Sequence, residues 1–216
     1  LDNGFLVALV DMPLHGWNRH QQFTSHADFA AYESSDFSGL TFFLEPLARI
    51  LNHVERNHRP SSIGLIGFSG GAWATTVYAA IDPRVTTSYP VAGTWPFFLR
   101  PLPERSPNFG DWEQRADTLP GFYALAGYLD LYVLGAAGRG RRQLQVLNRH
   151  DPSCFPGLGD RYAGDVDRHV RELGQGSWAL LDDATHREHT VSPYALSVIL
   201  DDLLYLENPQ HTGVNA

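Results

Sequence analysis

A serine between glycines is the pattern in this chain with the clearest chemical meaning. Residues 67–71 read Gly-Phe-Ser-Gly-Gly, with Ser69 at the centre. An apolar run over 63–68 precedes this turn and an alanine-rich run over 72–81 follows it, which predicts a strand and then a helix. A serine on such a sharp turn stands clear of the sheet, close to the positive end of the helix, provided that its neighbours two places away are small. The pattern therefore predicts that Ser69 is a nucleophile.

Two histidines are candidates for the base that this chemistry needs. A serine hydroxyl is a weak nucleophile until a base within hydrogen-bond reach takes its proton. An imidazole suits that task because its unperturbed pKa of about 6.5 lies near neutrality. His186 and His189 both follow an apolar run over 177–181. A zinc site made from this pair is disfavoured because the sequence offers no further well-placed ligands.

Asp151 is the first candidate for the acid that orients the base. It lies a few residues after an apolar run over 143–148, and Pro152 favours an extended or turn backbone at that position. A carboxylate there would fix the imidazole tautomer and stabilise the imidazolium. Asp160 and Asp165, farther along the same connection, are the alternatives.

The elements that would position these residues alternate along the chain. Near-continuous apolar runs are typical of buried parallel strands, whereas apolar residues at helical spacing lie between them. Because parallel strands present their carboxyl ends at one edge of the sheet, residues far apart in sequence can meet there. The sequence predicts a single α/β domain over residues 1–216, with a mostly parallel sheet and helices on both faces. The expected strands are 4–10, 63–68, 85–92, 143–148 and 177–181, and the expected helices are 37–57, 72–81, 121–136 and 193–206.

Residues 94–120 interrupt this alternation. Five prolines in this segment exclude a regular helix or an inner strand, and several aromatic residues accompany them. The segment predicts a lid or a pocket wall, although a proline-rich surface loop whose rings pack on the core explains the composition equally well.

Composition excludes several other functions. A net charge of -8 and a pI near 5.6 give no electrostatic basis for binding nucleic acid or an anionic membrane. No apolar run approaches the ~20 residues that a membrane span requires. The single cysteine, Cys154, excludes an internal disulfide and a multi-cysteine metal site and fits a reducing, cytoplasmic compartment. We expect neither a metal nor a cofactor.

These residues together resemble the α/β-hydrolase superfamily. Residues 11–17, Asp-Met-Pro-Leu-His-Gly-Trp, are similar to the segment that ends a sheet strand in many members. Ser69, Asp151 and His186 match the superfamily's nucleophile, acid and base positions in its chain order. His186 is preferred over His189 because its distance after the strand is typical of the superfamily. The resemblance also implies that the backbone N–H of Gly70 is one oxyanion donor.

The second oxyanion donor of this superfamily comes from a loop after an earlier strand, which should precede residue 1. The resemblance therefore implies that the usual N-terminal strands are missing here. A missing segment or a second chain would complete the sheet.

The expected activity is hydrolysis of a small-molecule carboxylic ester through an acyl-enzyme on Ser69, as in a carboxylesterase-like serine hydrolase. A peptidase or a thioesterase would use the same residues. The alternative from another class is a weakened or inactive member of the fold that serves as a binding module. A phosphate-binding function is disfavoured because residues 67–71 match neither of the glycine-rich motifs that bind phosphate.

Overall fold

The computed structural model describes residues 4–100 and 107–207. The chain divides into two compact units, one formed by Leu1–Ser61 with Gly110–Ala124 and the other by Ser62–Phe109 with Leu125–Ala216. We call the first the α1 unit and the second the sheet unit. The predicted segment 94–120 is divided between them, and its residues 101–106 lie outside the described residues. A single domain over 1–216 stays a prediction.

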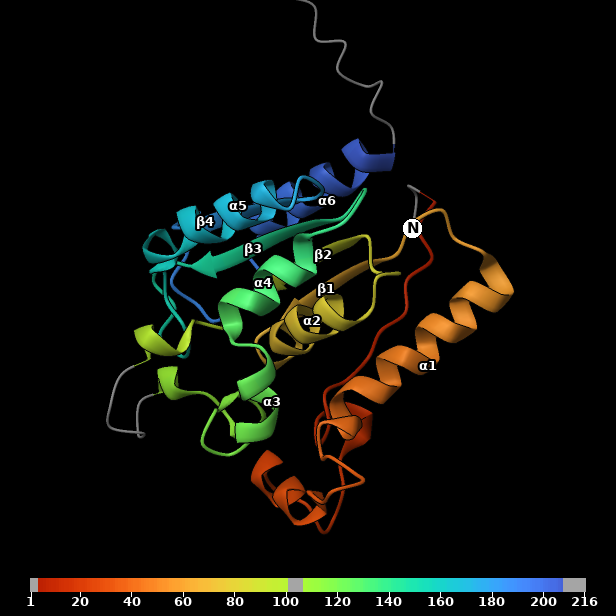
Figure 1. Ribbon diagram of the computed structural model, residues 1–216, viewed down its shortest axis with the longest axis vertical. Coiled ribbons are helices and arrows are strands. Elements are labelled where there is room, and N and C mark those ends of the chain that lie inside the picture. The colour runs from red at the N-terminus through yellow and green to blue at the C-terminus, as the bar shows by residue number, and fades with distance from the viewer. Residues whose placement is uncertain (1–3, 101–106, 208–216) are drawn as a thin grey trace, which may run out of the picture. The chain divides into compact units, whose positions relative to one another are not determined.

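The sheet unit contains a four-stranded sheet in which all neighbouring strands are parallel (Figure 1). The strands follow one another across the sheet in chain order, as expected where each pair is joined by a crossover on one face or the other. This arrangement confirms the predicted parallel α/β architecture. The strands are β1 (Gly64–Phe68), β2 (Thr87–Val91), β3 (Arg142–Asn148) and β4 (Ser177–Asp183).

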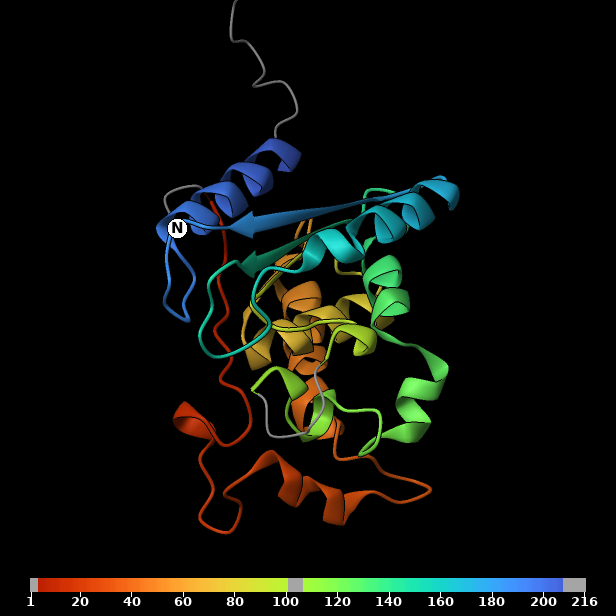
Figure 2. The same ribbon diagram turned by 90° about the vertical axis from the view of Figure 1, so that its left-hand side faces the viewer.

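Helices of the sheet unit cover both faces of this sheet, as predicted (Figure 2). Successive side chains of a strand point to opposite faces, so alternate residues of β2 and β3 meet different helices. Gln143 of β3 lies under Gly135 of α4, whereas its neighbour Leu144 packs with Ala195 of α6. The helices of this unit are α2 (Gly70–Ile81), α4 (Tyr128–Ala136), α5 (Ala163–Glu172) and α6 (Pro193–Glu207).

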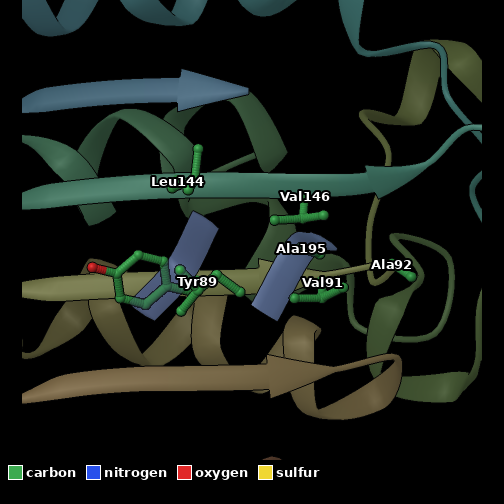
Figure 3. Packing of buried hydrophobic residues seen from close by; sticks show 7 residues of the cluster. Tyr89, Val91, Ala92, Leu144, Val146 and Ala195 are labelled. Carbon is green, nitrogen blue, oxygen red and sulfur yellow. The ribbon is translucent and has the colours of Figure 1, made fainter. Parts of the chain in front are cut away.

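The core between the sheet and α6 is apolar (Figure 3). Each fully buried valine or leucine side chain contributes about 1.5–3 kcal/mol relative to an exposed one. This core fixes the strands whose carboxyl ends carry the candidate site. The α6 helix begins as the sequence predicts, because Ser192 Oγ accepts a hydrogen bond from Ala195 N at 2.9 Å. The buried members of the cluster are Tyr89, Val91, Ala92, Leu144, Val146, Ala195 and Ile199.

The expected helix 121–136 is two helices, α3 (Pro120–Leu125) and α4. Gly127 has an extended backbone, with a φ of -81° and a ψ of 177°, and its N–H donates to Asp130 Oδ2 at 2.9 Å. This carboxylate caps α4 and ends the continuous helix that the apolar pattern predicted. Helix α5 was not predicted from the sequence.

The α1 unit contains helix α1 (Thr41–His58) and several short 3₁₀ helices. The predicted strand over 4–10 is wrong, because these residues pair with no strand in the described chain and carry no arrow in Figure 1. A strand needs a hydrogen-bonded neighbour, and the apolar pattern alone does not supply one. The side chains of Leu6, Val7 and Leu9 are exposed.

Candidate active site

Ser69 occupies the tight turn between β1 and α2. Its backbone has a φ of 55° and a ψ of -120°, a conformation that non-glycine residues adopt rarely and at a cost of order 1–3 kcal/mol. The turn is held by a hydrogen bond of 2.9 Å from Ser69 N to Val91 O at the end of β2. The strained turn lifts the serine hydroxyl to the carboxyl edge of the sheet.

The two glycines that flank the serine are not equivalent. A Cβ atom on Gly67 would lie 2.1 Å from the carbonyl oxygen of Gly71, so position 67 requires glycine. A Cβ atom on Gly71 would meet nothing within 4 Å. The expectation that both neighbours must be small is therefore right for Gly67 and wrong for Gly71.

Gly93, two residues after β2, supports the turn and was not predicted as a site residue from the sequence. A Cβ atom there would lie 2.2 Å from Ala72 Cβ and 2.9 Å from Ser69 O. Ala92 before it has a φ of 53°. A glycine directly after an apolar strand, next to the serine turn, is a signal that close backbone approach could have explained.

His189 lies between the serine and the acid. Because an ionised carboxylate only accepts hydrogen bonds, His189 Nδ1 carries the proton and donates to Asp151 Oδ2 at 2.7 Å. His189 Nε2 then holds the free lone pair and accepts from the Ser69 hydroxyl at 2.9 Å. This tautomer is the one in which an imidazole can take a proton from a serine.

Hydrogen bonds fix the Asp151 carboxylate, whose side chain is fully buried. The backbone N–H groups of Ser153 and Cys154 donate to Oδ1 at 2.8 and 3.1 Å. Burial alone raises the pKa of the Asp151 carboxyl, but the bond from His189 and these two backbone bonds outweigh it and hold that pKa below its usual value. The acid is therefore ionised at neutral pH.

The structure reverses the order in which the two histidines were preferred. His186, the first choice for the base, lies with its Nε2 3.4 Å from Asp183 Oδ2 and its Nδ1 3.7 Å from Glu188 Oε2. Neither ring nitrogen makes a hydrogen bond among the described residues. The second choice, His189, is the one beside Ser69. The loop after β4 turns so that residue 189, and not residue 186, reaches the serine.

The His189 ring is positioned by neighbours from two other segments. Its centroid lies 4.6 Å from that of Phe68, and the Cys154 sulfur lies 3.7 Å from Nε2. The side chain of His189 remains 22% exposed. The ring is thus held on its sides yet accessible to solvent.

The alternative acids are remote from this arrangement. Asp160 is exposed on a 3₁₀ helix, and Asp165 is exposed on α5, where its Oδ1 accepts from Arg168 at 2.8 Å. Gly70, the predicted oxyanion donor, is the first residue of α2. The first N–H groups of a helix have no intrahelical acceptor, which suits that role.

Within residues 4–100 and 107–207, two groups of side chains have the residue types of a metal site. In the sheet unit these are Asp151, Cys154 and His189, but both nitrogens of His189 already face Asp151 and Ser69. In the α1 unit they are His26, Asp111 and Glu113. His26 places Nδ1 3.0 Å from Glu113 Oε2 and Nε2 3.2 Å from Pro13 O, so both of its nitrogens also have protein partners.

Across the described residues, every helix is too short or too polar to cross a lipid bilayer. No protein-family model matches this sequence, and no curated protein does.

Solved structures share the fold of this chain at low sequence identity. A carbohydrate esterase family 15 glucuronoyl esterase from Caldicellulosiruptor kristjansonii is 16% identical with a TM-score of 0.55, and the match covers 84% of this chain and 58% of that one. Est1E from Butyrivibrio proteoclasticus is 12% identical with a TM-score of 0.51, over 78% and 70% of the two chains. The esterase Pf2001 of Pyrococcus furiosus is 14% identical with a TM-score of 0.50, over 91% and 67%.

This chain thus corresponds to only part of the length of each of these structures. Together with the parallel sheet and its helices, the matches show an α/β-hydrolase fold.

Proposed function

We propose that this protein is a serine hydrolase that cleaves carboxylic esters of small molecules through an acyl-enzyme on Ser69. The observation that supports it is one continuous chain of hydrogen bonds. Ser69 Oγ lies 2.9 Å from His189 Nε2, and His189 Nδ1 lies 2.7 Å from Asp151 Oδ2. A strained serine turn has no value for packing alone, since a relaxed turn would connect β1 and α2 at lower cost.

The first half of the proposed reaction acylates the serine. Ser69 Oγ attacks the ester carbonyl carbon while its proton passes to His189 Nε2, and the carbonyl oxygen becomes an oxyanion near the Gly70 N–H. Asp151 stabilises the imidazolium. The tetrahedral intermediate then collapses, the bond to the alcohol oxygen breaks, and His189 returns the proton to the departing alcohol.

The second half repeats these steps with water as the nucleophile. His189 Nε2 takes a proton from water, the hydroxide attacks the acyl carbon, and Ser69 Oγ leaves with the proton from His189. One ester and one water thus give one acid and one alcohol. An ester is the favoured substrate because its alkoxide leaves readily, and because two of the solved structures reported above, from Caldicellulosiruptor kristjansonii and Pyrococcus furiosus, are named as esterases.

The proposal is tested by intact-mass spectrometry after treatment with a fluorophosphonate, which labels only activated serines. We expect one adduct on the parent protein and none on Ser69→Ala. The matched control is Ser88→Ala, since Ser88 is a buried serine of β2 whose hydroxyl accepts from Gln143 and lies outside the proposed reaction. This variant should be labelled like the parent.

An unlabelled parent that also hydrolyses no p-nitrophenyl ester would overturn the proposal and favour a binding module. Labelling without ester turnover, but with turnover of a thioester or peptide, would keep Ser69 as nucleophile and reject the ester as substrate.

A further inference from the structure

Asn148, the last residue of β3, bonds to the acid and to the loop that carries the base. It is fully buried. Its Nδ2 group donates to Asp151 Oδ2 at 3.2 Å and to the carbonyl oxygen of Thr190 at 2.8 Å. Thr190 is the residue after His189, so one amide group touches both sides of the Asp151–His189 contact.

The oxygen that Asn148 contacts is the one that accepts the hydrogen bond from His189 Nδ1. Asp151 Oδ2 accepts from His189 Nδ1, whereas Oδ1 is taken by two backbone N–H groups. A carboxylate held at Oδ1 alone can still swing its second oxygen. The Asn148 donor removes that freedom, because it fixes Oδ2 in the position where the ring meets it.

The second bond of Asn148 fixes the position of the loop that carries His189. The loop 184–192 leaves β4 and returns to α6, and its own backbone must bring His189 to the serine. Asn148 attaches the carbonyl of Thr190 to the end of β3, a rigid element of the sheet. Displacement of a reacting group by about 1 Å can cost on the order of 10²-fold in rate, so a fixed attachment next to the base matters for turnover.

We propose, on the premise of the proposed function, that Asn148 is a positioning residue that holds the Asp151 carboxylate and the His189 ring in the relative positions that their hydrogen bond needs. It does not touch the reacting atoms. An asparagine is suited to this role because its amide group carries two N–H donors on one nitrogen, which here serve two acceptors on different segments. Its Oδ1 has no partner among the described residues, which leaves the amide group as the part of the side chain in use.

The test compares Asn148→Ala with Gln143→Ala. Gln143 is a matched control on the same strand: it is fully buried, its Nε2 donates to Ser88 Oγ at 3.1 Å, and its Oε1 accepts from Trp178 Nε1 at 3.1 Å. Both variants lose buried hydrogen bonds, and only one loses contact with Asp151. Circular dichroism would establish that each is folded.

We expect kcat for a p-nitrophenyl ester to fall about 10- to 100-fold in Asn148→Ala with little change in KM, and to stay within about threefold in Gln143→Ala. A fall confined to kcat indicates displaced catalytic groups rather than lost substrate binding. Equal falls in the two variants, or none in Asn148→Ala, would overturn the proposal.

Proton NMR supplies a readout independent of turnover. The Nδ1 proton of a histidine bound to a carboxylate gives a far-downfield resonance, which should be present in the parent and in Gln143→Ala and lost or shifted in Asn148→Ala. If the parent is neither labelled by the fluorophosphonate nor active on a p-nitrophenyl ester, the proposed function fails, yet this comparison still decides whether Asn148 holds the pair. An unchanged resonance in Asn148→Ala would reject the role.

Asn148→Asp covers the case in which the alanine variant does not fold. Aspartate has the same shape but, when ionised at about pH 9, presents only acceptors to Asp151 Oδ2 and to the Thr190 carbonyl. We expect kcat to fall at least about 10-fold relative to the parent. Parent-like kcat in this variant would contradict the proposal.

Discussion

Two histidine–aspartate pairs lie at the ends of β3 and β4, and their residue types do not distinguish them. In one pair, His189 Nδ1 and Asp151 Oδ2 are 2.7 Å apart, and the other ring nitrogen meets a serine. In the second pair, His186 Nε2 and Asp183 Oδ2 are 3.4 Å apart without a hydrogen bond.

The difference lies in which segments each carboxylate joins. Asp183 Oδ1 accepts from Thr185 N at 2.9 Å and from the Thr185 hydroxyl at 2.6 Å, while Oδ2 accepts from the Ser192 hydroxyl. Thr185 and Ser192 stand near the two ends of the loop 184–192. Asp183 therefore closes the loop. Asp151 accepts just as many other donors, two backbone N–H groups at Oδ1 and Asn148 Nδ2 at Oδ2, but these come from the end of β3 and the residues after it, and its Oδ2 also accepts from His189. A carboxylate thus acts on a histidine where the loop places the ring within hydrogen-bond distance, and the number of its other donors does not decide it.

The largest effect should separate the two histidines. We expect His189→Ala to lower kcat/KM for an ester by roughly 10⁴-fold or more, because it removes the only base within reach of Ser69 among the described residues. His186→Ala should cost less than about tenfold, since its ring contacts no proposed reacting group. Steady-state kinetics on both variants measure this. A greater loss in His186→Ala would reverse our assignment.

The choice between these histidines could not be made from spacing. The distance of His186 from its strand suggested that it reached the serine, but the path of the loop depends on the bonds that Asp183 makes with Thr185 and Ser192. The bond to Thr185 joins residues two apart, whereas the bond to Ser192 spans nine residues and closes the loop. Spacing after the strand does not reveal where such a closure places each histidine. Ser192 has a second role as the cap of α6, where its Oγ accepts from Ala195 N.

Other features followed more directly from the sequence. The serine turn and the four parallel strands were predictable because buried strands carry continuous apolar runs and glycine permits the strained turn. The same reasoning failed at 4–10, where the apolar residues Leu6, Val7 and Leu9 are exposed and pair with no strand in the described chain. An apolar run indicates that a segment can form a buried strand. Whether it does so depends on a neighbouring strand to which it can hydrogen-bond.

The second largest effect should separate Asp151 from Asp183, whose substitution should differ in its effect on activity but not on stability. Asp151→Asn is expected to lower kcat about 10³- to 10⁴-fold, because the amide no longer stabilises the imidazolium or fixes its tautomer. Asp183→Asn should cost less than about tenfold in kcat. Ester kinetics measure both, and parent-like kcat in Asp151→Asn would remove it from the proposed triad.

The free energy of unfolding is the internal control for the Asp151→Asn and Asp183→Asn variants. Each substitution puts an amide where a buried carboxylate accepts several donors, so each should lose a similar free energy of unfolding, about 1–3 kcal/mol. Urea denaturation of both variants measures it. If Asp151→Asn were far less stable than Asp183→Asn, its loss of activity would reflect unfolding rather than chemistry.

The smallest effect concerns the pH dependence of stability. Burial raises the pKa of the Asp183 carboxyl, but the hydrogen bonds from Ser192 and Thr185 outweigh it and hold that pKa below its usual value. A carboxyl whose pKa is lower in the folded than in the unfolded state stabilises the fold above the unfolded pKa of about 3.9, and this contribution is lost as the pH falls through the folded pKa. The parent should therefore lose free energy of unfolding more steeply than Asp183→Asn as the pH falls below about 4.

The expected difference in slope is at most about 1.36 kcal/mol per pH unit, the value for one proton. Urea denaturation at stepwise lower pH measures it, and the depressed pKa of Asp151 contributes equally to parent and variant and cancels in the difference. Equal slopes would mean that Asp183 is not held ionised by the loop, and the distinction between a carboxylate that closes the loop and one that serves the base would fail. A steeper slope in the parent, with near-parent kcat in Asp183→Asn, would place the role of Asp183 in the loop and not in the reaction.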